Sequence, residues 1–360
     1  MNLDMYGWNG DWEEKFAQYR AQGCEPARVL EAAQGIYRVW VADGWCFAKV
    51  SGKLRHFAVG RSDFPAVGDW VALEGVRSGD ALTGHSAVIH GLLSRKSIFQ
   101  RRIAGNELDS QVIAANVDVV FLVMAANDMN LRRLERFLIV GWESGAVPVV
   151  ILTKTDLVAD DARSHVDAVI AMSSGVAVHA VSVEAGVGLD AVTAYLQKGK
   201  TVALIGASGA GKSTRINYCM DGTVQRVQGV REGDVRGRHT TTQRTLYLLP
   251  SGAMMMDTPG MRELQLWDGS DGIDQAFDDI ARLAQGCSYR NCQHLSEPGC
   301  AVQEAVLRGT LDVARLNNYR KTERELAFVA RKDDMREQRA EREKWKKLSK
   351  SARQNAHKSR

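Results

Sequence analysis

The chain has 360 residues, of which 45% are hydrophobic and 25% are charged, with a net charge of +4. This composition supports a buried core and excludes a globally disordered chain, a collagen-like repeat and a small disulfide scaffold. No apolar run reaches the roughly 18 residues that span a bilayer, and acidic residues near the start oppose a secretory signal peptide, so we expect a cytoplasmic protein.

The segment from Val29 to about Leu93 predicts a small β-barrel. Short strand-like stretches at Ile36–Val41, Cys46–Val50 and Asp69–Leu73 are separated by Gly, Asp and Ser turns. Several brief strands in so short a segment are typical of a barrel, and an OB-type barrel is one candidate.

From about Asn116 the pattern changes to alternating strands and helices. Leu131–Glu143 places its apolar residues on one helical face, and Leu189–Leu196 predicts a second helix. The predicted strands are Val117–Val123, Val147–Leu152, Ala177–Val181, Thr201–Ile205, Arg244–Leu249 and Ala253–Met256. Such a succession predicts an α/β domain with a parallel sheet covered on both faces.

A base-recognition motif follows the second of these strands. Its four residues are Thr153, Lys154, Thr155 and Asp156. They resemble the guanine-specificity motif Asn-Lys-x-Asp, whose Asp accepts hydrogen bonds from the guanine N1–H and the exocyclic amine. Asp156 keeps that carboxylate, whereas Thr153 stands where the motif has Asn. The loop Ser182–Glu184 follows the next strand, and we expect Ser182 to help form the base site.

The strongest signal is a phosphate-binding loop after the strand Thr201–Ile205. Its residues are Gly206, Ala207, Ser208, Gly209, Ala210, Gly211, Lys212, Ser213 and Thr214, which fit G-x-x-x-x-G-K-[ST]. The glycines let backbone amides converge on phosphate oxygens, and the following helix adds its dipole. We expect Lys212 to reach the β- and γ-phosphates as a catalytic group and Ser213 to ligate Mg²⁺.

Two further segments match motifs that are expected in a nucleotide hydrolase. Asp257-Thr-Pro-Gly260 ends the strand Ala253–Met256, where Asp257 is placed to hold Mg²⁺ and the amide of Gly260 to sense the γ-phosphate. The polar segment Arg236–Thr242 suits a switch in which the hydroxyl of Thr241 meets Mg²⁺. Within it His239 either orients the attacking water or is an ordinary loop histidine. Met261 follows Gly260, where many GTPases carry a water-orienting Gln, so we expect slow intrinsic turnover.

The order of these motifs is unusual, because the base motif precedes the phosphate loop. A circularly permuted GTPase domain explains the order. Permutation is tolerable because surface connections can rejoin the strands of a doubly wound sheet without altering the site.

Near the C-terminus the sequence predicts a metal site. Cys287, Cys292, His294 and Cys300 supply three thiolates and one imidazole within fourteen residues. These are the ligand types and the ligand number of a closed structural zinc site. Helical patterns follow at about Val302–Leu307 and Thr310–Ala330.

The chain ends in a basic tail. Arg331–Arg360 contains 12 Lys or Arg against 5 Asp or Glu, a charge of +7 that leaves −3 on the preceding residues. This asymmetry predicts a polyanionic partner, nucleic acid rather than membrane. A solvated helix face is an equally open alternative.

Together these motifs resemble the ribosome small subunit-dependent GTPase A family over roughly residues 28 to 325. The resemblance rests on the permuted order, Gly-Arg-His-Thr-Thr-Thr, Asp-Thr-Pro-Gly and Cys-x₄-Cys-x-His-x₅-Cys. It is strengthened by Val67–Val71, Ser94–Phe99 and Ala115–Asp118. The resemblance implies an N-terminal OB fold that binds RNA, a central circularly permuted P-loop GTPase domain and a C-terminal helical zinc-binding domain.

The resemblance leads to a domain prediction. We expect an N-terminal extension at 1–27, the OB fold at 28–98, the GTPase domain at 99–267, the zinc-binding domain at 268–328 and the basic tail at 329–360.

The resemblance also implies the function. We expect a monomeric GTPase that binds the small ribosomal subunit and its rRNA, assists late maturation and is stimulated by that subunit, with one structural zinc and with Mg²⁺ accompanying GTP. An RNA-binding assembly scaffold with negligible turnover is the main alternative. An ATP-using enzyme is disfavoured by Lys154 and Asp156.

Overall fold

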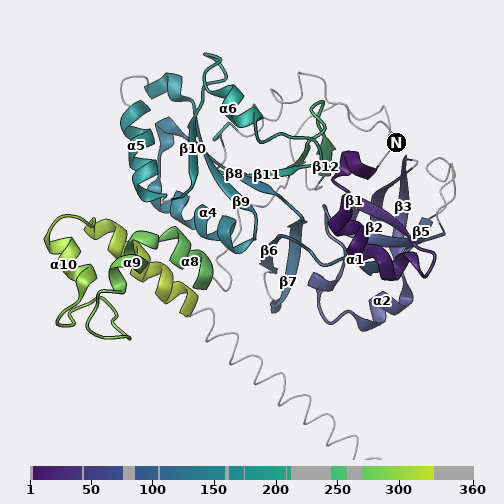
Figure 1. Ribbon diagram of the computed structural model, residues 1–360, viewed down its shortest axis with the longest axis horizontal. Coiled ribbons are helices and arrows are strands. Elements are labelled where there is room, and N and C mark those ends of the chain that lie inside the picture. Colours follow the sequence, from purple (N-terminus) through teal and green to yellow (C-terminus); the bar gives the residue numbers. More distant parts are fainter. Residues whose placement is uncertain are drawn as a thin grey trace, which may run out of the picture.

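The computed structural model describes residues 3–42, 44–75, 86–103, 106–158, 162–173, 175–207, 209–211, 245–257 and 270–327. Figure 1 shows three parts: a barrel from the N-terminal region on the right, an α/β body at the upper centre and left, and a group of helices from the C-terminal region below that body. Within these ranges no helix combines the length and the apolar character needed to cross a membrane.

The described residues form thirteen strands, eight α-helices and further short helical segments. The strands are β1 (Glu25–Ala33), β2 (Ile36–Val41), β3 (Gly44–Val50), β4 (Trp70–Glu74), β5 (Ser86–Leu92), β6 (Ile98–Ile103), β7 (Asn106–Ala115), β8 (Val119–Ala125), β9 (Val147–Thr153), β10 (Ala177–Ala180), β11 (Thr201–Gly206), β12 (Thr245–Leu248) and β13 (Met254–Asp257). The α-helices are α1 (Gly10–Arg20), α2 (Gly52–Phe57), α4 (Leu131–Glu143), α5 (Ala162–Met172), α6 (Leu189–Thr193), α8 (Ser270–Ala276), α9 (Asp278–Ala284) and α10 (Ala301–Leu307), followed by a helical segment at 313–327. Short 3₁₀ helices are η1 (Leu3–Tyr6), η2 (Arg61–Asp63), η3 (Ala126–Asp128) and η4 (Thr155–Val158).

The first five strands close into a barrel. Their order is β1-β2-β3-β5-β4, and β4 pairs back onto β1. Only the β3–β5 pair is parallel, and α2 lies in the connection from β3 to β4. Alternate residues such as Val29, Val39, Val71 and Ile89 fill the interior. This topology confirms the predicted OB-type barrel.

The residues before the barrel form η1 and α1, which pack on its outer surface. Asn9 caps α1 by accepting a hydrogen bond from the backbone N–H of Trp12 at 3.2 Å. The ring of Trp8 meets that of the buried Trp70 edge-on at a centroid distance of 4.7 Å, and Phe16 is fully buried beside them. The N-terminal segment is therefore anchored by aromatic burial.

The central sheet runs β10-β9-β8-β11-β13-β12. Its strands are parallel except β12, which is antiparallel to β13, so the prediction of an all-parallel sheet is wrong at this edge. The turn from Leu249 to Ala253 is too short for the crossover that parallel strands need. β12 also pairs with β1 at Thr245 and Glu31, which joins the sheet to the barrel.

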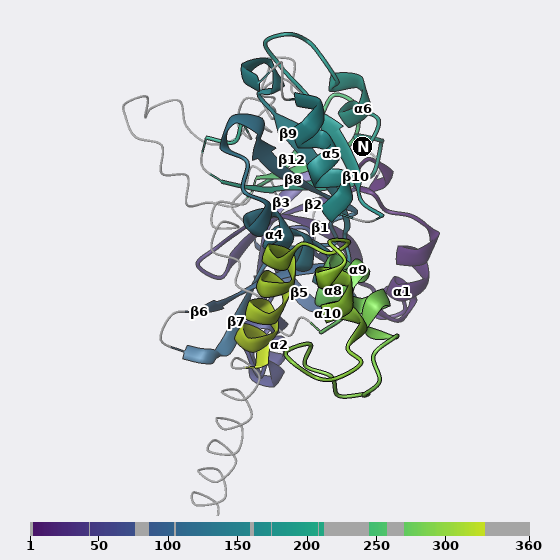
Figure 2. The same cartoon turned by 90° about the vertical axis from the view of Figure 1, so that its left-hand side faces the viewer.

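Helices cover both faces of the sheet, as predicted. Along β8, Leu122 and Met124 face the cluster that contains Leu134 and Leu138 of α4. Phe121 and Val123, which alternate with them, face the cluster around α6. The view in Figure 2 shows α8 lying against α4, and there the Cα of Gly272 comes so close to α4 that an added Cβ would lie 2.9 Å from the Ile139 carbonyl oxygen.

Buried polar contacts fix the junction between the barrel and the sheet. Asp69 is fully buried and pairs with Arg95 at 2.7 Å. The side chain of Asn116 accepts from the N–H of Lys96 at 2.8 Å and donates to the Gly68 carbonyl at 3.0 Å. These residues belong to the segments Val67–Val71, Ser94–Phe99 and Ala115–Asp118, so those segments build the junction itself.

A cationic side chain ties the C-terminal helices to the sheet. Arg315 contacts Asp279 at 2.6 Å and reaches Glu135 of α4 at 2.9 Å. Asn318 also donates to Glu135. Burial raises the pKa of Glu135, and the guanidinium of Arg315 opposes that rise. These contacts hold the helical segment at 313–327 against α4, which covers one face of the sheet.

Candidate functional site

The nucleotide motifs meet at one edge of the sheet. β11 ends at Gly206, which pairs with Val123 near the end of β8. β9 ends at Thr153, which pairs with Ala125, and β10 ends beside Leu152. The carboxyl ends of parallel strands share an edge, and ligands of open α/β sheets bind there. The structure thus brings together segments that lie some fifty residues apart, measured from Thr153 to Gly206.

The phosphate loop depends on glycine for different reasons at different positions. A Cβ on Gly206 would lie 2.3 Å from the carbonyl oxygen of Val123, so no side chain fits between β11 and β8. Gly209 and Gly211 have φ values of 75° and 86°, in the left-handed region that glycine adopts without strain. Ala207 lies between the strand and this turn. These three glycines therefore shape the end of β11 and the described part of the turn that follows it.

Thr153 connects the base motif to the phosphate loop. It is buried, and its Oγ1 donates to the carbonyl of Ala210 at 2.7 Å, closer than the Met124 carbonyl at 3.3 Å. A hydroxyl has one proton to donate, so the Ala210 contact is the principal one. Its methyl group lies beside the position that a Cβ on Gly211 would occupy. A threonine in place of Asn therefore still fixes the two motifs together.

Asp156 accepts a hydrogen bond from Ser182, the residue predicted to help form the base site. Ser182 Oγ donates to Asp156 Oδ1 at 2.5 Å and accepts from the N–H of Ala185 at 3.0 Å. Ser182 is almost fully buried, whereas Asp156 is exposed. The buried hydroxyl orients one carboxylate oxygen and leaves the other available to a ligand. Thr155 lies alongside, in η4, and its N–H faces the Val181 carbonyl at 3.5 Å.

A cavity of about 220 Å³ opens beside the phosphate loop. It is lined by Ala207, Gly209 and Ala210 on one side and by Lys154, whose φ is 58°, on another. Sequence reasoning missed three polar residues that also line it, Asn127, Asp128 and Arg133. Asn127 and Asp128 belong to η3, which follows β8, so the rule that strand ends build the site could have identified them.

Part of the predicted site lies outside the described residues. These positions are Ser208, Lys212, Ser213, Thr214, His239, Thr241 and Gly260. The backbone of Asp257 ends β13, next but one to β8 across β11, while its side chain is also outside the described part.

The predicted metal ligands come together in the C-terminal part. The four donor atoms of Cys287, Cys292, His294 and Cys300 all lie within 4.8 Å of one another. Cys300 Sγ is 3.5 Å from His294 Nδ1 and 3.9 Å from Cys287 Sγ, and Cys287 Sγ is 3.6 Å from His294 Nδ1. Zinc bond lengths in a tetrahedron place two sulfurs about 3.8 Å apart and sulfur and nitrogen about 3.6 Å apart. The cluster could therefore hold a metal ion.

Two of the four donors, His294 and Cys287, have a pKa shifted towards the form that binds metals, whereas burial raises the pKa of the Cys292 thiol to about 11. Burial lowers the pKa of His294, which favours the neutral imidazole that binds metals. Burial opposes ionisation of Cys287, yet the backbone amides of Val302 and Ala301 hold the pKa of its thiol below the ordinary value. Cys300 is the N-cap of α10, and its Sγ accepts a hydrogen bond from the backbone N–H of Gln303 at 3.4 Å.

The loop that presents His294 is fixed by one carboxylate. Glu297 accepts from the backbone N–H groups of Gln293, Leu295 and Ser296 at 2.7–3.1 Å. These bonds, led by the one from Gln293, lower the pKa of Glu297 to about 2. A carboxyl with a depressed pKa stabilises the folded state while it is ionised, and this stabilisation is lost only as the pH falls towards the depressed pKa. The loop should therefore keep its shape throughout the neutral range.

Comparison with known proteins gives a consistent result. The model of the family described as RsgA GTPase matches residues 92–267. The chain is 41% identical over 331 residues to a protein of Oceanobacillus iheyensis named small ribosomal subunit biogenesis GTPase RsgA 1, covering 91% of this chain and 93% of that protein.

Two solved structures are also similar. The crystal structure of YjeQ from Thermotoga maritima matches with a TM-score of 0.63 and 25% identity, over 84% of this chain and 99% of that one. The structure of YloQ, described as a circularly permuted GTPase, matches in fold with a TM-score of 0.60 and 22% identity, over 84% of this chain and 95% of that one. The permuted strand order is thus shared with known structures.

Proposed function

The chain belongs to the RsgA GTPase family, and on that premise we propose that it binds the small ribosomal subunit, assists its late maturation and hydrolyses GTP to GDP and phosphate under stimulation by the subunit. The hydrogen bond from Thr153 to the Ala210 carbonyl carries this proposal, because it joins a guanine-type base motif to a phosphate loop. GTP hydrolysis measured with and without purified small subunits tests it, and a rate that stays near zero in both measurements would favour the scaffold alternative.

Each predicted residue has a place in this mechanism. The amides of the loop from Gly206 to Gly211 hold the phosphates, and Lys212 neutralises charge that develops on the β- and γ-oxygens. Ser213 and Asp257 would hold the Mg²⁺ that accompanies GTP, and the ion would neutralise charge on the phosphate oxygens. The remaining proposed contacts come from Ser208, Thr214, Thr241 and Gly260, with His239 orienting the attacking water.

We propose that the metal of the C-terminal cluster is zinc. Three sulfurs and one nitrogen are the donor set of a structural zinc site. The four protein donors would fill all positions of a tetrahedron, so a bound zinc ion would supply stability and would leave no position for a substrate. The four ligands are Cys287, Cys292, His294 and Cys300.

The domain division also remains a proposal. The closed barrel, which ends with β5 at Leu92, supports an OB fold near 28–98, and the family match that ends at residue 267 supports a GTPase domain at 99–267. Residues 268–328 then form the zinc-binding domain, preceded by an extension at 1–27 and followed by a tail at 329–360. We propose that the protein acts as a cytoplasmic monomer.

Base recognition provides a direct prediction. Asp156→Asn is expected to weaken GTP binding by about 1.5–3 kcal/mol, because the guanine donors lose a charged acceptor. Xanthosine triphosphate, which presents an acceptor where guanine has its amine, should bind the variant better than the wild type. Titration with fluorescent nucleotide analogues measures both affinities.

A matched control removes an exposed aspartate elsewhere. Asp167→Asn, on the outer surface of α5, makes the same chemical change and should leave both affinities unaltered. If Asp156→Asn binds GTP as the wild type does, the guanine contact does not come from this residue.

A further inference from the structure

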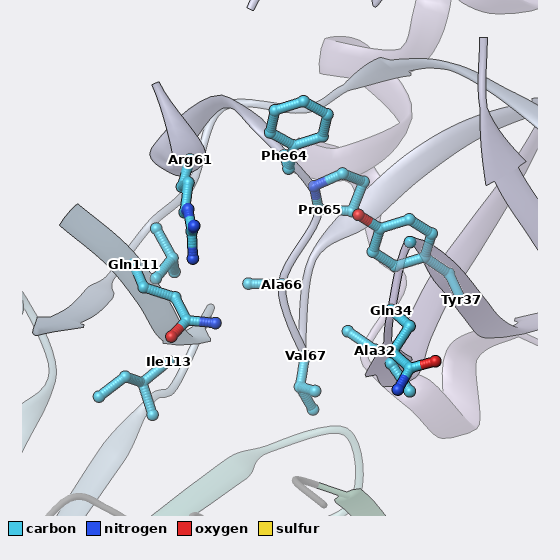
Figure 3. A pocket seen from close by; sticks show the side chains of 13 residues that line it. Ala32, Gln34, Tyr37, Arg61, Phe64, Pro65, Ala66, Val67, Gln111 and Ile113 are labelled. Atoms are coloured by element: carbon cyan, nitrogen blue, oxygen red, sulfur yellow. The ribbon is translucent and has the colours of Figure 1, made fainter. Parts of the chain in front are cut away.

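A cavity of about 210 Å³ differs in charge from a larger one of about 270 Å³. The larger cavity lies between the barrel and β7, where Figure 3 shows Arg61 and Gln111 facing Tyr37. Of the described residues that line it, Arg61 alone is charged, and it already interacts with another group of the protein. The smaller cavity has a surplus of positive charge. Its charged lining residues are the cations Arg28, Lys96, Lys198 and Lys200 and the carboxylates Asp4 and Asp118.

This smaller cavity lies at the edge of the sheet opposite the nucleotide motifs. Asp118 immediately precedes β8, and Lys198–Lys200 immediately precede β11, so both mark the amino ends of strands whose other ends approach the phosphate loop. The N-terminal segment supplies Asp4 and the residues from Gly7 to Asn9, and β1 of the barrel supplies Arg28. The cavity is therefore separate from the nucleotide site and joins three parts of the chain.

Arg28 is a buried lining residue whose hydrogen bonds are incomplete. It is only 2% exposed. Its terminal nitrogens donate to the carbonyl oxygens of Tyr6 and Asn116, both at 3.3 Å, and to Thr201 Oγ1 at 3.1 Å. Its Nε has no hydrogen-bond partner among the described residues. All three acceptors are neutral, so these bonds leave the positive charge of the guanidinium uncompensated.

The charge of Arg28 also lacks a carboxylate partner. None of the ion pairs between described residues includes Arg28, because the nearby Asp69 and Asp118 pair with other cations. Burial lowers the pKa of Arg28 to about 10 and the two aspartates oppose that shift, so the guanidinium stays charged at neutral pH. Its carbon lies 4.9 Å from the centre of the Trp70 ring, which compensates part of the charge. Buried charges in proteins are almost always paired, so an anion is expected beside Arg28.

Three exposed lysines surround the mouth of the cavity. Within the described structure Lys198 has no hydrogen bond and no ion pair. Lys200 contacts Asp118 at 3.3 Å and Lys96 contacts Asp11 at 3.4 Å, and both pairs are open to solvent, where such contacts are weak. An ammonium group has three N–H donors, so each lysine can also donate to a ligand.

We propose that this cavity binds a small oxyanion of the phosphate class, between the buried guanidinium of Arg28 and the ammonium groups of the lysines. Arginine and lysine are the side chains that bind phosphate groups in proteins. A volume of about 210 Å³ is below the roughly 300–1,000 Å³ of sites for drug-sized ligands, which suits so small an ion. The ion would connect the N-terminal segment, the barrel and the start of β11, so its binding should stabilise the folded protein. Binding requires neither the nucleotide site nor the small subunit.

The test titrates inorganic phosphate into the full chain by calorimetry at constant ionic strength, with saturating GDP in the nucleotide site. Lys198→Ala removes one charged donor and should weaken phosphate binding about tenfold. Asp118→Asn removes a carboxylate from the lining and keeps an oxygen for the N–H of Thr201, so it should strengthen binding severalfold. Arg28→Met should abolish binding, and the two other variants decide the question if this one does not fold.

Two exposed positions away from the cavity provide matched controls. Lys53→Ala on α2 and Asp167→Asn on α5 make the same chemical changes and should bind phosphate as the wild type does. Phosphate should also raise the midpoint of thermal unfolding more than sodium chloride of equal ionic strength, and this rise should be smaller in Lys198→Ala. The proposal is overturned if the wild type shows no saturable phosphate binding, or if Lys198→Ala and Asp118→Asn bind phosphate with its affinity.

Ribose 5-phosphate distinguishes the free ion from a phosphate group on a larger molecule. If this monoester binds and Lys198→Ala weakens it about tenfold, the site takes phosphate groups carried by small molecules. If inorganic phosphate binds and the monoester does not, the ligand is the free ion. Both results support an oxyanion site and identify its source.

Discussion

Cys300→Ala is expected to release the bound metal and unfold the C-terminal helical part. Cys300 is buried, caps α10 and lies within 4 Å of both Cys287 Sγ and His294 Nδ1. Structural zinc sites contribute about 10–16 kcal/mol of apparent binding free energy to folding, far beyond the usual 0.5–3 kcal/mol of a single substitution. Metal analysis by mass spectrometry and hydrogen exchange over residues 287–307 measure the two effects.

Cys46→Ala is the matched control for this prediction. Cys46 is also buried, but it belongs to the barrel interior and is not among the clustered donors. Its loss should cost packing alone and leave one metal ion per chain. Undiminished metal content in Cys300→Ala, or purified wild-type protein without metal, would contradict the assignment of a structural zinc site.

Gly206→Ala is expected to abolish tight GTP binding. The added Cβ would approach the Val123 carbonyl oxygen to 2.3 Å, a distance that real Cβ atoms do not adopt. Both partners belong to paired strands, so relief requires β11 to separate from β8 or the phosphate loop to move. Overpacking of this kind costs about 1–3 kcal/mol or more, and the displaced amides would no longer converge on phosphate. Nucleotide titration and thermal unfolding measure the two losses.

Gly52→Ala is the matched control, because it makes the same substitution at a position away from the phosphate loop. Gly52 begins α2, has no neighbour within 4 Å of an added Cβ and does not have a positive φ. Alanine should leave GTP affinity unchanged there and slightly favour the helix. If Gly206→Ala binds GTP as tightly as this control, the close approach of β11 and β8 does not determine the phosphate-binding conformation of the loop.

Long periodic segments were predictable from the sequence. The amphipathic pattern at Leu131–Glu143 gives the bounds of α4, and the apolar run before Gly206 gives β11. Burial explains this success, since α4 covers a sheet face and β11 lies at the sheet centre. The metal ligands were equally predictable, because four donors within fourteen residues can be recognised without knowing which distant segments meet in the fold.

Elements whose residues are mixed in character were harder to predict. The hairpin of β6 and β7 carries charged and amide side chains in both strands, and among the described strands it forms a sheet of its own. A run of buried residues is found only where β7 ends, at Val112–Ala115, among the side chains that the structure describes. The antiparallel direction of β12 follows from a tight turn and from its contact with β1 in another domain. For α1, a helical signal was present in the spacing of Trp12, Phe16 and Tyr19.

The role of Thr153 required the structure. Comparison with the motif Asn-Lys-x-Asp shows only that Thr153 lacks the side-chain amide of Asn. The hydrogen bond to Ala210 depends on β9 and β11 ending at the same edge with β8 between them, which no local pattern encodes. The same reasoning applies to Ser182, whose hydroxyl reaches Asp156 across a gap of 26 residues.

The central claim is that this GTPase is switched on by the small ribosomal subunit, and phosphate release from GTP tests it most directly. The full chain alone should turn over slowly, since Met261 follows Gly260 and a thioether accepts hydrogen bonds too weakly to orient water. Purified small subunits should raise the rate about tenfold or more, within what a partner contributes to other GTPases, and large subunits should not. An equal rate with and without small subunits would contradict the account.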